Sequence, residues 1–289
     1  MLEFTGERLT TEVLNGNTIR HLHRYAIAFD SVKNKHVLDL ACGEGYGSNL
    51  LALHAKSVIG MDIDPVSISH AQTKYKKNNL SFQTASADNI PLPDNSVDVV
   101  VSFETIEHHD KHVEMLSEFK RILKPDGILI ISSPDKRVNT EILGTINEFH
   151  VKELYAEEFK SLLSTYFSNT QFLLQKEVAG SLIIPEDKVT ELHEFQGNFS
   201  TIRSIDTPLF TFNIAIASNS ALPEAIYTSY FESFEFLYHE IGVNKRHIST
   251  LAQQIDEYER KLKMINDSGS YKLAKNISKI IHSFKNWFK

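Results

Sequence analysis

Short apolar runs alternate with helix-length segments through the first half of this 289-residue chain. Runs rich in valine, isoleucine and leucine are typical of strands buried inside a sheet. Their alternation with helices predicts a mostly parallel sheet that helices cover on both faces. The strands are expected at 36–41, 57–61, 80–84, 97–103 and 127–132, and the helices at 13–30, 46–54, 64–77 and 111–123. The fold class is therefore α/β.

The second half of the chain is less regular. A helix is expected over 152–167, and strands over 171–178 and 209–216. The polar stretch 180–207 between these strands is long for a connection. It is either a functional loop near an acceptor site or a tolerated decoration, and both interpretations stay open. The α/β domain is expected to cover 1–217.

The net charge and the cysteine content indicate which binding partners and which cellular compartment to expect. The net charge of −7 argues against nucleic-acid binding over the whole surface, so no nucleic-acid partner is expected. Cys42 is the only cysteine, which excludes an intrachain disulfide and fits a reducing compartment. No secretory signal or membrane-spanning apolar run is visible, and a cytoplasmic protein is expected.

A heptad-like seam runs through 227–266, with apolar residues at alternating three- and four-residue steps. A repeat of this length predicts a coiled coil, and one polar seam residue can set its register or oligomeric state. The seam comprises Tyr227, Tyr230, Phe234, Leu237, Ile241, Asn244, Ile248, Leu251, Ile255, Tyr258, Leu262 and Ile265. We therefore expect a homo-oligomer formed through 227–266. The alternative is a long amphipathic helix that packs on its own domain.

The last residues, 270–289, are typical of a basic amphipathic helix, with Trp287 and Phe288 near its end. Residues 272–289 hold five lysines and no acidic side chain. This composition favours an anionic membrane surface, so peripheral contact with the inner face of the plasma membrane is expected. The alternative is a helix that packs against its own chain or a partner chain.

A glycine-rich turn, D-L-A-C-G-E-G-Y-G at 39–47, follows the first predicted strand and opens a helix. Its glycines permit a tight turn and let a ligand approach the backbone, as dinucleotides and S-adenosylmethionine both require. Ser48 replaces the third glycine of the dinucleotide fingerprint, and the Asp39 carboxylate can hold a cationic methionine moiety. S-adenosylmethionine is therefore favoured, although Asp39 could instead bond to the backbone of the turn. After the second strand, Asp62 can accept both ribose hydroxyls.

The chain resembles the class I S-adenosylmethionine-dependent methyltransferases over about residues 4–217. The resemblance rests on the ordered motifs V-L-D-L-A-C-G-E-G, V-I-G-M-D-I-D, S-A-D-N-I-P-L-P-D-N-S-V-D-V-V, F-E-T-I-E-H and L-K-P-D-G-I-L-I-I-S-S-P. It implies a Rossmann-like, seven-stranded sheet with a reversed last strand, here followed by a C-terminal helical coiled-coil extension. The cofactor residues that it implies are Asp39, Ala41, Gly43, Gly45, Asp62, Ile63, Ser86, Ala87 and Phe103. Many relatives have Asp at the position of Ser86, so the adenine contact is weaker here or moves to Asp88.

Three further segments, at 4–8, 21–25 and 147–154, are similar to a subgroup associated with bacterial surface polysaccharide biosynthesis. The similarity implies O-methylation of a sugar or glycan intermediate. Arg24 lies in the second segment, where its guanidinium can pair with the donor's carboxylate. The alternative for Arg24 is a surface salt bridge.

Methyl transfer to a hydroxyl needs alignment and a base. His108, after the fourth strand, is the first candidate for the base and His150 the second, because the pKa of histidine lies near neutrality. Each could instead be a structural hydrogen-bonding residue. No set of His, Cys and carboxylate residues has convincing metal-ligand spacing, and no metal is expected.

Other functions remain open. The acceptor could be a quinone or another small metabolite. The chain could also be a non-catalytic coiled-coil scaffold that retains the cofactor fold. A nicotinamide-dependent dehydrogenase is the most distant alternative, because Ser48 disfavours it.

Overall fold

The computed structural model describes residues 9–12, 16–222 and 227–268. Contacts divide the chain into two compact units, with the boundary between Phe234 and Glu235. The described part of the second unit is helical and belongs to α6 (Phe234–Asp267). The basic helix predicted for 270–289 lies outside the described residues. Among the helices that the structure describes, none is both long enough and apolar enough to cross a membrane.

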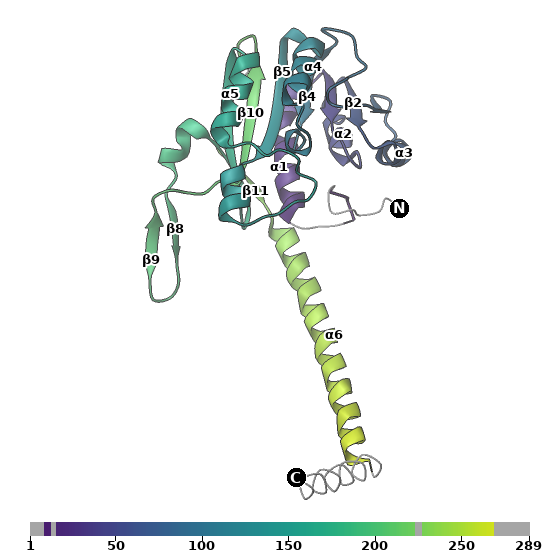
Figure 1. Ribbon diagram of the computed structural model, residues 1–289, viewed down its shortest axis with the longest axis vertical. Helices are drawn as coiled ribbons and strands as arrows, with labels where there is room; N and C mark the ends of the chain where they lie inside the picture. Colours follow the sequence, from purple (N-terminus) through teal and green to yellow (C-terminus); the bar gives the residue numbers. More distant parts are fainter. Residues whose placement is uncertain (1–8, 13–15, 223–226, 269–289) are drawn as a thin grey trace, which may run out of the picture. The chain divides into compact units, whose positions relative to one another are not determined.

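The first unit is built around a mixed nine-stranded sheet with the order β11-β7-β6-β10-β5-β4-β1-β2-β3 (Figure 1). The strands β3, β2, β1, β4 and β5 run parallel, and β10 is antiparallel to both of its neighbours, β5 and β6. The bounds are β1 His36–Leu40, β2 Ser57–Asp62, β3 Leu80–Thr84, β4 Val97–Ser102, β5 Leu123–Pro134, β6 Asn169–Val178, β7 Gly180–Pro185, β10 Phe212–Ser218 and β11 Ser229–Glu232. The strands predicted for the first half and the reversed strand near the end are thus confirmed.

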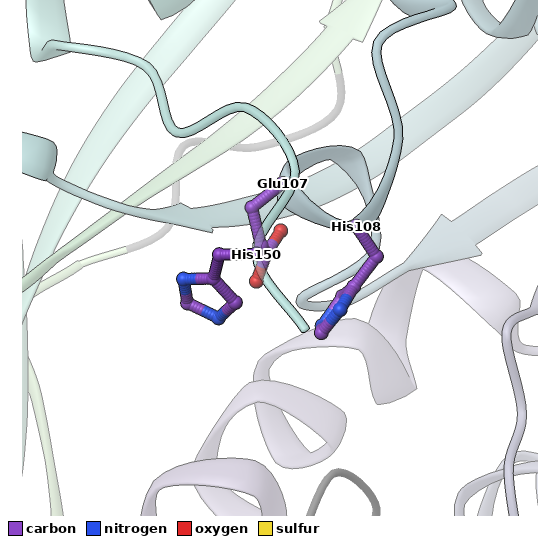
Figure 2. Close-up of side chains that lie close together, drawn as sticks. All are labelled: Glu107, His108 and His150. Atoms are coloured by element: carbon purple, nitrogen blue, oxygen red, sulfur yellow. The ribbon is translucent and has the colours of Figure 1, made fainter. Parts of the chain in front are cut away.

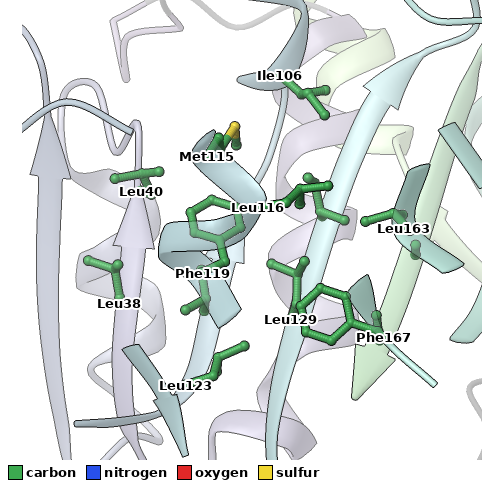
Figure 3. Close-up of a cluster of buried hydrophobic side chains, with 14 of the residues drawn as sticks. Leu38, Leu40, Ile106, Met115, Leu116, Phe119, Leu123, Leu129, Leu163 and Phe167 are labelled. Atoms are coloured by element: carbon green, nitrogen blue, oxygen red, sulfur yellow. The ribbon is translucent and has the colours of Figure 1, made fainter. Parts of the chain in front are cut away.

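Side-chain alternation along the central strands produces a core on each face of the sheet. Val37 and Val99 pack toward α1 (Gly16–Val32) and α2 (Tyr46–Leu51). Leu38 and Val100 face the opposite way, toward α4 (His112–Ile122) and α5 (Ala156–Tyr166). Figure 3 shows this second cluster, in which Phe119 of α4 lies among the strand side chains. A smaller cluster holds α3 (Pro65–Lys74) against the end of the sheet beside β3.

The expected number of seven strands is wrong for the main sheet of the described residues, because the sheet continues through β7 and β11 and has nine. Strand β7 lies inside the predicted insertion 180–207, and β11 lies inside the predicted coiled coil 227–266. The β6–β7 hairpin turns at Ala179, and β7 buries Ile183 and Ile184. His23 of α1 bonds to Ser181 of β7 and Ser229 of β11, both at 2.9 Å, and so links the helix to the two added strands. These pairings depend on distant partners, which local sequence patterns do not report.

The rest of the 180–207 segment forms a short 3₁₀ helix, η3 (Glu186–Glu191), and a separate hairpin. Strands β8 (Glu194–Gly197) and β9 (Ile202–Ile205) pair antiparallel in that hairpin. Three of its large apolar side chains, Phe195, Phe199 and Ile202, are exposed. The hairpin therefore offers an apolar surface outside the main core.

Helix α6 carries the predicted seam from Phe234 onward. The seam residues from Ile248 onward, which also include Leu251, Ile255, Tyr258, Leu262 and Ile265, are each between 44% and 65% exposed. Tyr230, which the seam also included, lies in β11. An exposed apolar stripe is what a coiled coil buries on association. The homo-oligomer stays a prediction.

Candidate functional site

A cavity of about 620 Å³ opens at the carboxyl ends of the parallel strands, within the first unit. Residues that follow or end four of these strands line it: Ala41 after β1, Asp62 at the end of β2, Ser86 after β3 and Phe103 after β4. Ligands of open α/β sheets bind at this edge, because loops diverge there and leave a crevice. The cavity is the candidate site.

The glycine-rich turn forms one wall of this cavity. Ala41, Gly43 and Gly45 have φ values of 57°, 52° and 90°, in the left-handed region that favours glycine. A Cβ on Gly45 would lie 2.8 Å from the Phe82 ring, so no larger residue fits there. The Gly43 amide donates to the Asp62 carboxylate at 2.8 Å, which holds the turn against the end of β2.

Asp39 lies beneath the turn and is absent from the cavity wall, as is Gly45. Its buried carboxylate accepts the Ser48 hydroxyl at 2.6 Å and the Tyr25 hydroxyl at 3.3 Å. Burial raises the pKa of Asp39 to about 7, against the opposing effect of these two hydrogen bonds. The sequence predicted that the Asp39 carboxylate contacts the methionine moiety of the donor. In the structure this carboxylate instead bonds to Ser48 and Tyr25, and through them it stabilises the glycine-rich turn.

We expect the raised pKa of Asp39 to make folding stability depend on pH. The folded state holds this proton more tightly than the unfolded chain, so stability falls as pH rises from about 4 to about 7 and then levels. Urea unfolding at pH 5, 6, 7 and 8 should show wild type losing stability relative to Asp39→Asn, by on the order of 1 kcal/mol per pH unit up to about 7. Parallel curves for the two proteins would contradict this expectation.

Three of the predicted cofactor residues, Ile63, Ser86 and Ala87, lie on the cavity wall. The Ser86 hydroxyl donates to the Asp88 carboxylate, which also pairs with Lys111. Lys111, and then Ser86, lower the pKa of Asp88 to about 2. Because Asp88 is also on the wall, an anionic acceptor is available beside the predicted adenine position.

Arg24 is fully buried, so a surface salt bridge is the wrong interpretation for it. Its Nε donates to Gln175 at 2.7 Å, its Nη1 lies 3.3 Å from the Glu104 carboxylate, and its guanidinium stacks over Phe212. Arg20, four residues earlier on α1, stacks over the same ring and lines the cavity. Arg20 is not among the residues that the sequence predicted for the site. The four-residue spacing, which places two arginines on one helix face, was the available signal.

The two predicted histidines come together on the cavity wall (Figure 2). His108 ends the 3₁₀ helix η1 (Ile106–His108), and His150 lies in the loop before α5. Their ring centroids are 5.1 Å apart and nearly perpendicular. Glu107 lies beside them, and its burial, followed by the charge of Glu104, raises its pKa well above the usual range. Separate sequence candidates thus form one cluster.

Residues 38–131 match the family model described as a methyltransferase domain. This segment contains the glycine-rich turn, Asp62, Phe103 and His108. The part of the chain that carries the predicted cofactor residues other than Arg24 therefore matches a methyltransferase domain model.

Two curated relatives are similar over the same region. A "Probable S-adenosylmethionine-dependent methyltransferase" of Mycolicibacterium smegmatis is 36% identical over 167 residues, covering 57% of this chain and 64% of the relative. Phthiotriol/phenolphthiotriol dimycocerosates methyltransferase 1 of Mycobacterium ulcerans is 32% identical over 138 residues, covering 46% of this chain and 50% of that protein. The chain thus spans less than two thirds of either relative's length.

Among solved structures, a SAM-dependent methyltransferase from Thermotoga maritima superimposes with a TM-score of 0.52 at 17% identity, covering 71% of this chain and 91% of that one. At this identity the likeness concerns the fold alone. The family match over 38–131, the reversed β10 and the cavity at the carboxyl ends of the strands agree with one another. Over residues 38–131 the chain is therefore similar to the methyltransferase domain family, and its fold resembles that of a solved S-adenosylmethionine-dependent methyltransferase.

Proposed function

We propose that this protein transfers a methyl group from S-adenosylmethionine to an oxygen atom of an acceptor. The observation that carries the proposal is a single cavity with the donor-type residues Ala41, Gly43 and Asp62 on one part of its wall and His108 and His150 on another. Donor and acceptor groups in one cavity can be aligned, and alignment supplies much of the reduction of the barrier.

The residues on the donor side fit this cofactor. Nη2 of Arg24, the predicted partner of the donor's carboxylate, is buried and has no hydrogen-bond partner among the residues that the structure describes. Arg24 itself does not line the cavity, whereas Arg20, which stacks over the same Phe212 ring, does. Asp62 would accept the ribose hydroxyls, and Ile63 would pack against adenine. The bound cofactor supplies the electrophilic methyl group, while these side chains orient it and hold its charged ends.

The histidines are proposed to act on the acceptor hydroxyl. Nδ1 of His108 lies 3.1 Å from the Phe149 carbonyl oxygen, which can only accept a hydrogen bond. Nδ1 of His150 lies 2.5 Å from a Glu153 carboxylate oxygen. In the neutral state both rings therefore carry the proton on Nδ1, and their Nε2 atoms carry the lone pair. Such a lone pair can receive the acceptor's proton.

Two acceptor classes have specific support. Resemblance of the segments at 4–8, 21–25 and 147–154 to a polysaccharide-associated subgroup favours a sugar or glycan hydroxyl, which is our first candidate. The second is an apolar acceptor, such as a quinol or a hydroxylated lipid. The exposed Phe195, Phe199 and Ile202 and the name of the Mycobacterium ulcerans relative favour it.

The proposal predicts that the full chain binds S-adenosylmethionine and not NADH, measured by titration calorimetry. Release of S-adenosylhomocysteine should then depend on an acceptor from one panel: sugar nucleotides and oligosaccharides, or quinols and hydroxylated lipids. Lack of S-adenosylmethionine binding would contradict the proposal. Binding without turnover on either panel would favour the scaffold interpretation.

A further inference from the structure

Three side chains with metal-binding atoms converge on the acceptor side of the cavity (Figure 2). One carboxylate oxygen of Glu107 and one ring nitrogen each of His108 and His150 lie within 4.8 Å of one another. Glu107 and His108 belong to η1, whereas His150 comes from a loop 42 positions later in the chain. This separation explains why the spacing in the sequence predicted no metal.

Backbone hydrogen bonds fix the two segments against each other. The carbonyl oxygen of Glu107 accepts the amides of Val151 at 2.8 Å and Lys152 at 3.0 Å. The His150 amide in turn donates to the Asn147 carbonyl at 3.1 Å. The three side chains are therefore placed by the fold before anything binds, which lowers the entropic cost of binding an ion.

Both histidines have the outer partners that metal-ligating histidines usually have. Such residues donate the N–H of one ring nitrogen to a carboxylate or a carbonyl, which orients the other nitrogen toward the metal. Glu153 serves His150 in this way and is itself held by the Thr140 hydroxyl. The Phe149 carbonyl serves His108.

Glu107 provides an independent indication of a ligand. The residue is only 1% exposed, yet its Oε2 atom has no hydrogen-bond partner within the described part of the chain. A buried polar atom without a partner is costly, and its presence in a native fold needs an explanation. A bound cation is a partner that this carboxylate oxygen lacks.

We propose that Glu107, His108 and His150 bind a divalent transition-metal ion. Imidazole nitrogens together with a carboxylate favour ions of the Zn²⁺, Fe²⁺ and Mn²⁺ class over Mg²⁺, which prefers oxygen ligands and water. Three protein ligands leave a coordination position for another molecule, as in catalytic metal sites. All three residues line the cavity, so that molecule is the methyl acceptor.

The catalytic consequence rests on the proposed function. Coordination lowers the pKa of the acceptor hydroxyl, which then loses its proton to water. The acceptor oxygen forms a bond to the methyl carbon as the carbon–sulfur bond breaks, and the sulfonium becomes a neutral thioether. His108 and His150 are then ligands, and neither ring has to remove the proton itself.

Metal binding is tested without donor or acceptor. The full chain is treated with a chelator, dialysed and titrated with Zn²⁺ by calorimetry and with Mn²⁺ by electron paramagnetic resonance. We expect one ion per chain, and at least about tenfold weaker binding in His108→Ala, His150→Ala and Glu107→Gln. Glu153→Gln should weaken binding by about 10–100-fold through His150. The control His109→Ala, whose ring contacts the Met115 sulfur instead, should bind as wild type does.

Zinc K-edge X-ray absorption on the wild-type chain provides a second test that needs no variant. Two imidazole nitrogens should appear around the ion. Absence of a bound ion, or affinity that the three ligand variants leave unchanged, would overturn the proposal. S-adenosylmethionine affinity is measured in parallel and should stay within about twofold in the ligand variants. Metal binding without S-adenosylmethionine binding would sink the proposed function and leave the metal site standing.

Discussion

Replacing Asp62 with alanine is expected to weaken S-adenosylmethionine binding by about 100-fold. The carboxylate lies at the end of β2 on the cavity wall, where it already accepts the amides of Gly43 at 2.8 Å and Asp64 at 2.9 Å. Its remaining lone pairs can accept the two ribose hydroxyls, and a hydrogen bond to a charged group contributes about 1.5–3 kcal/mol. Losing one to two such bonds corresponds to that change in Kd. Titration calorimetry measures it.

Asp98→Ala is a matched control for this prediction. Asp98 also accepts two hydrogen bonds, from the His36 amide and from Lys124, each at 2.7 Å, but it does not line the cavity. Its loss should lower the free energy of unfolding and leave the Kd for S-adenosylmethionine unchanged. An Asp62→Ala protein that binds within threefold of wild type would show that Asp62 only holds the turn.

Arg24→Met is expected to lower the free energy of unfolding by about 3–5 kcal/mol. Removing one partner of a buried ion pair leaves the other charge uncompensated in a poorly solvated position. Here the Glu104 carboxylate loses its guanidinium partner, and buried Gln175 loses the donor at 2.7 Å. Urea denaturation measures the change.

Arg20→Met tests whether burial causes this effect. Arg20 stacks over the same Phe212 ring, but it pairs with Glu177, whose side chain is 45% exposed. An exposed pair contributes about 0–1 kcal/mol, so the loss should be several times smaller. In the Arg24→Met, Glu104→Gln double variant, the summed single effects should exceed the measured one by at least about 1 kcal/mol. Equal losses for both arginines, or strict additivity, would contradict the burial argument.

Much of the fold could be predicted because its signals are local. The strand 80–84 coincides with β3, and the other strands of the first half are present with small shifts at their ends. Apolar runs, glycines and helix caps each restrict the backbone conformation of a few neighbouring residues, so they can be recognised in a short stretch of sequence. The family resemblance implied the cavity residues Ala41, Gly43, Asp62, Ile63, Ser86, Ala87 and Phe103, and each of them ends a strand or lies within three residues of a strand end.

Features that depend on distant partners could not be predicted in this way. β7 and β11 join the main sheet because β7 pairs with β6, β11 pairs with β7, and His23 of α1 bonds to both added strands. The position of Asp39 beneath the turn depends on Ser48 and on Tyr25 of another helix. Neither the added strand pairings nor the hydrogen bonds of Asp39 produce a periodic pattern in the sequence.

By itself, the sequence determined the α/β class and the glycine-rich turn, because these follow from periodicity and from backbone angles that few residues adopt. Only the tertiary structure decided that Arg24 is buried and that Glu107, His108 and His150 form one cluster. The physical reason is that packing of the sheet and its loops brings together groups separated by tens of residues. Charges and unpaired polar atoms affect one another's energy strongly only when folding brings them to contact distance.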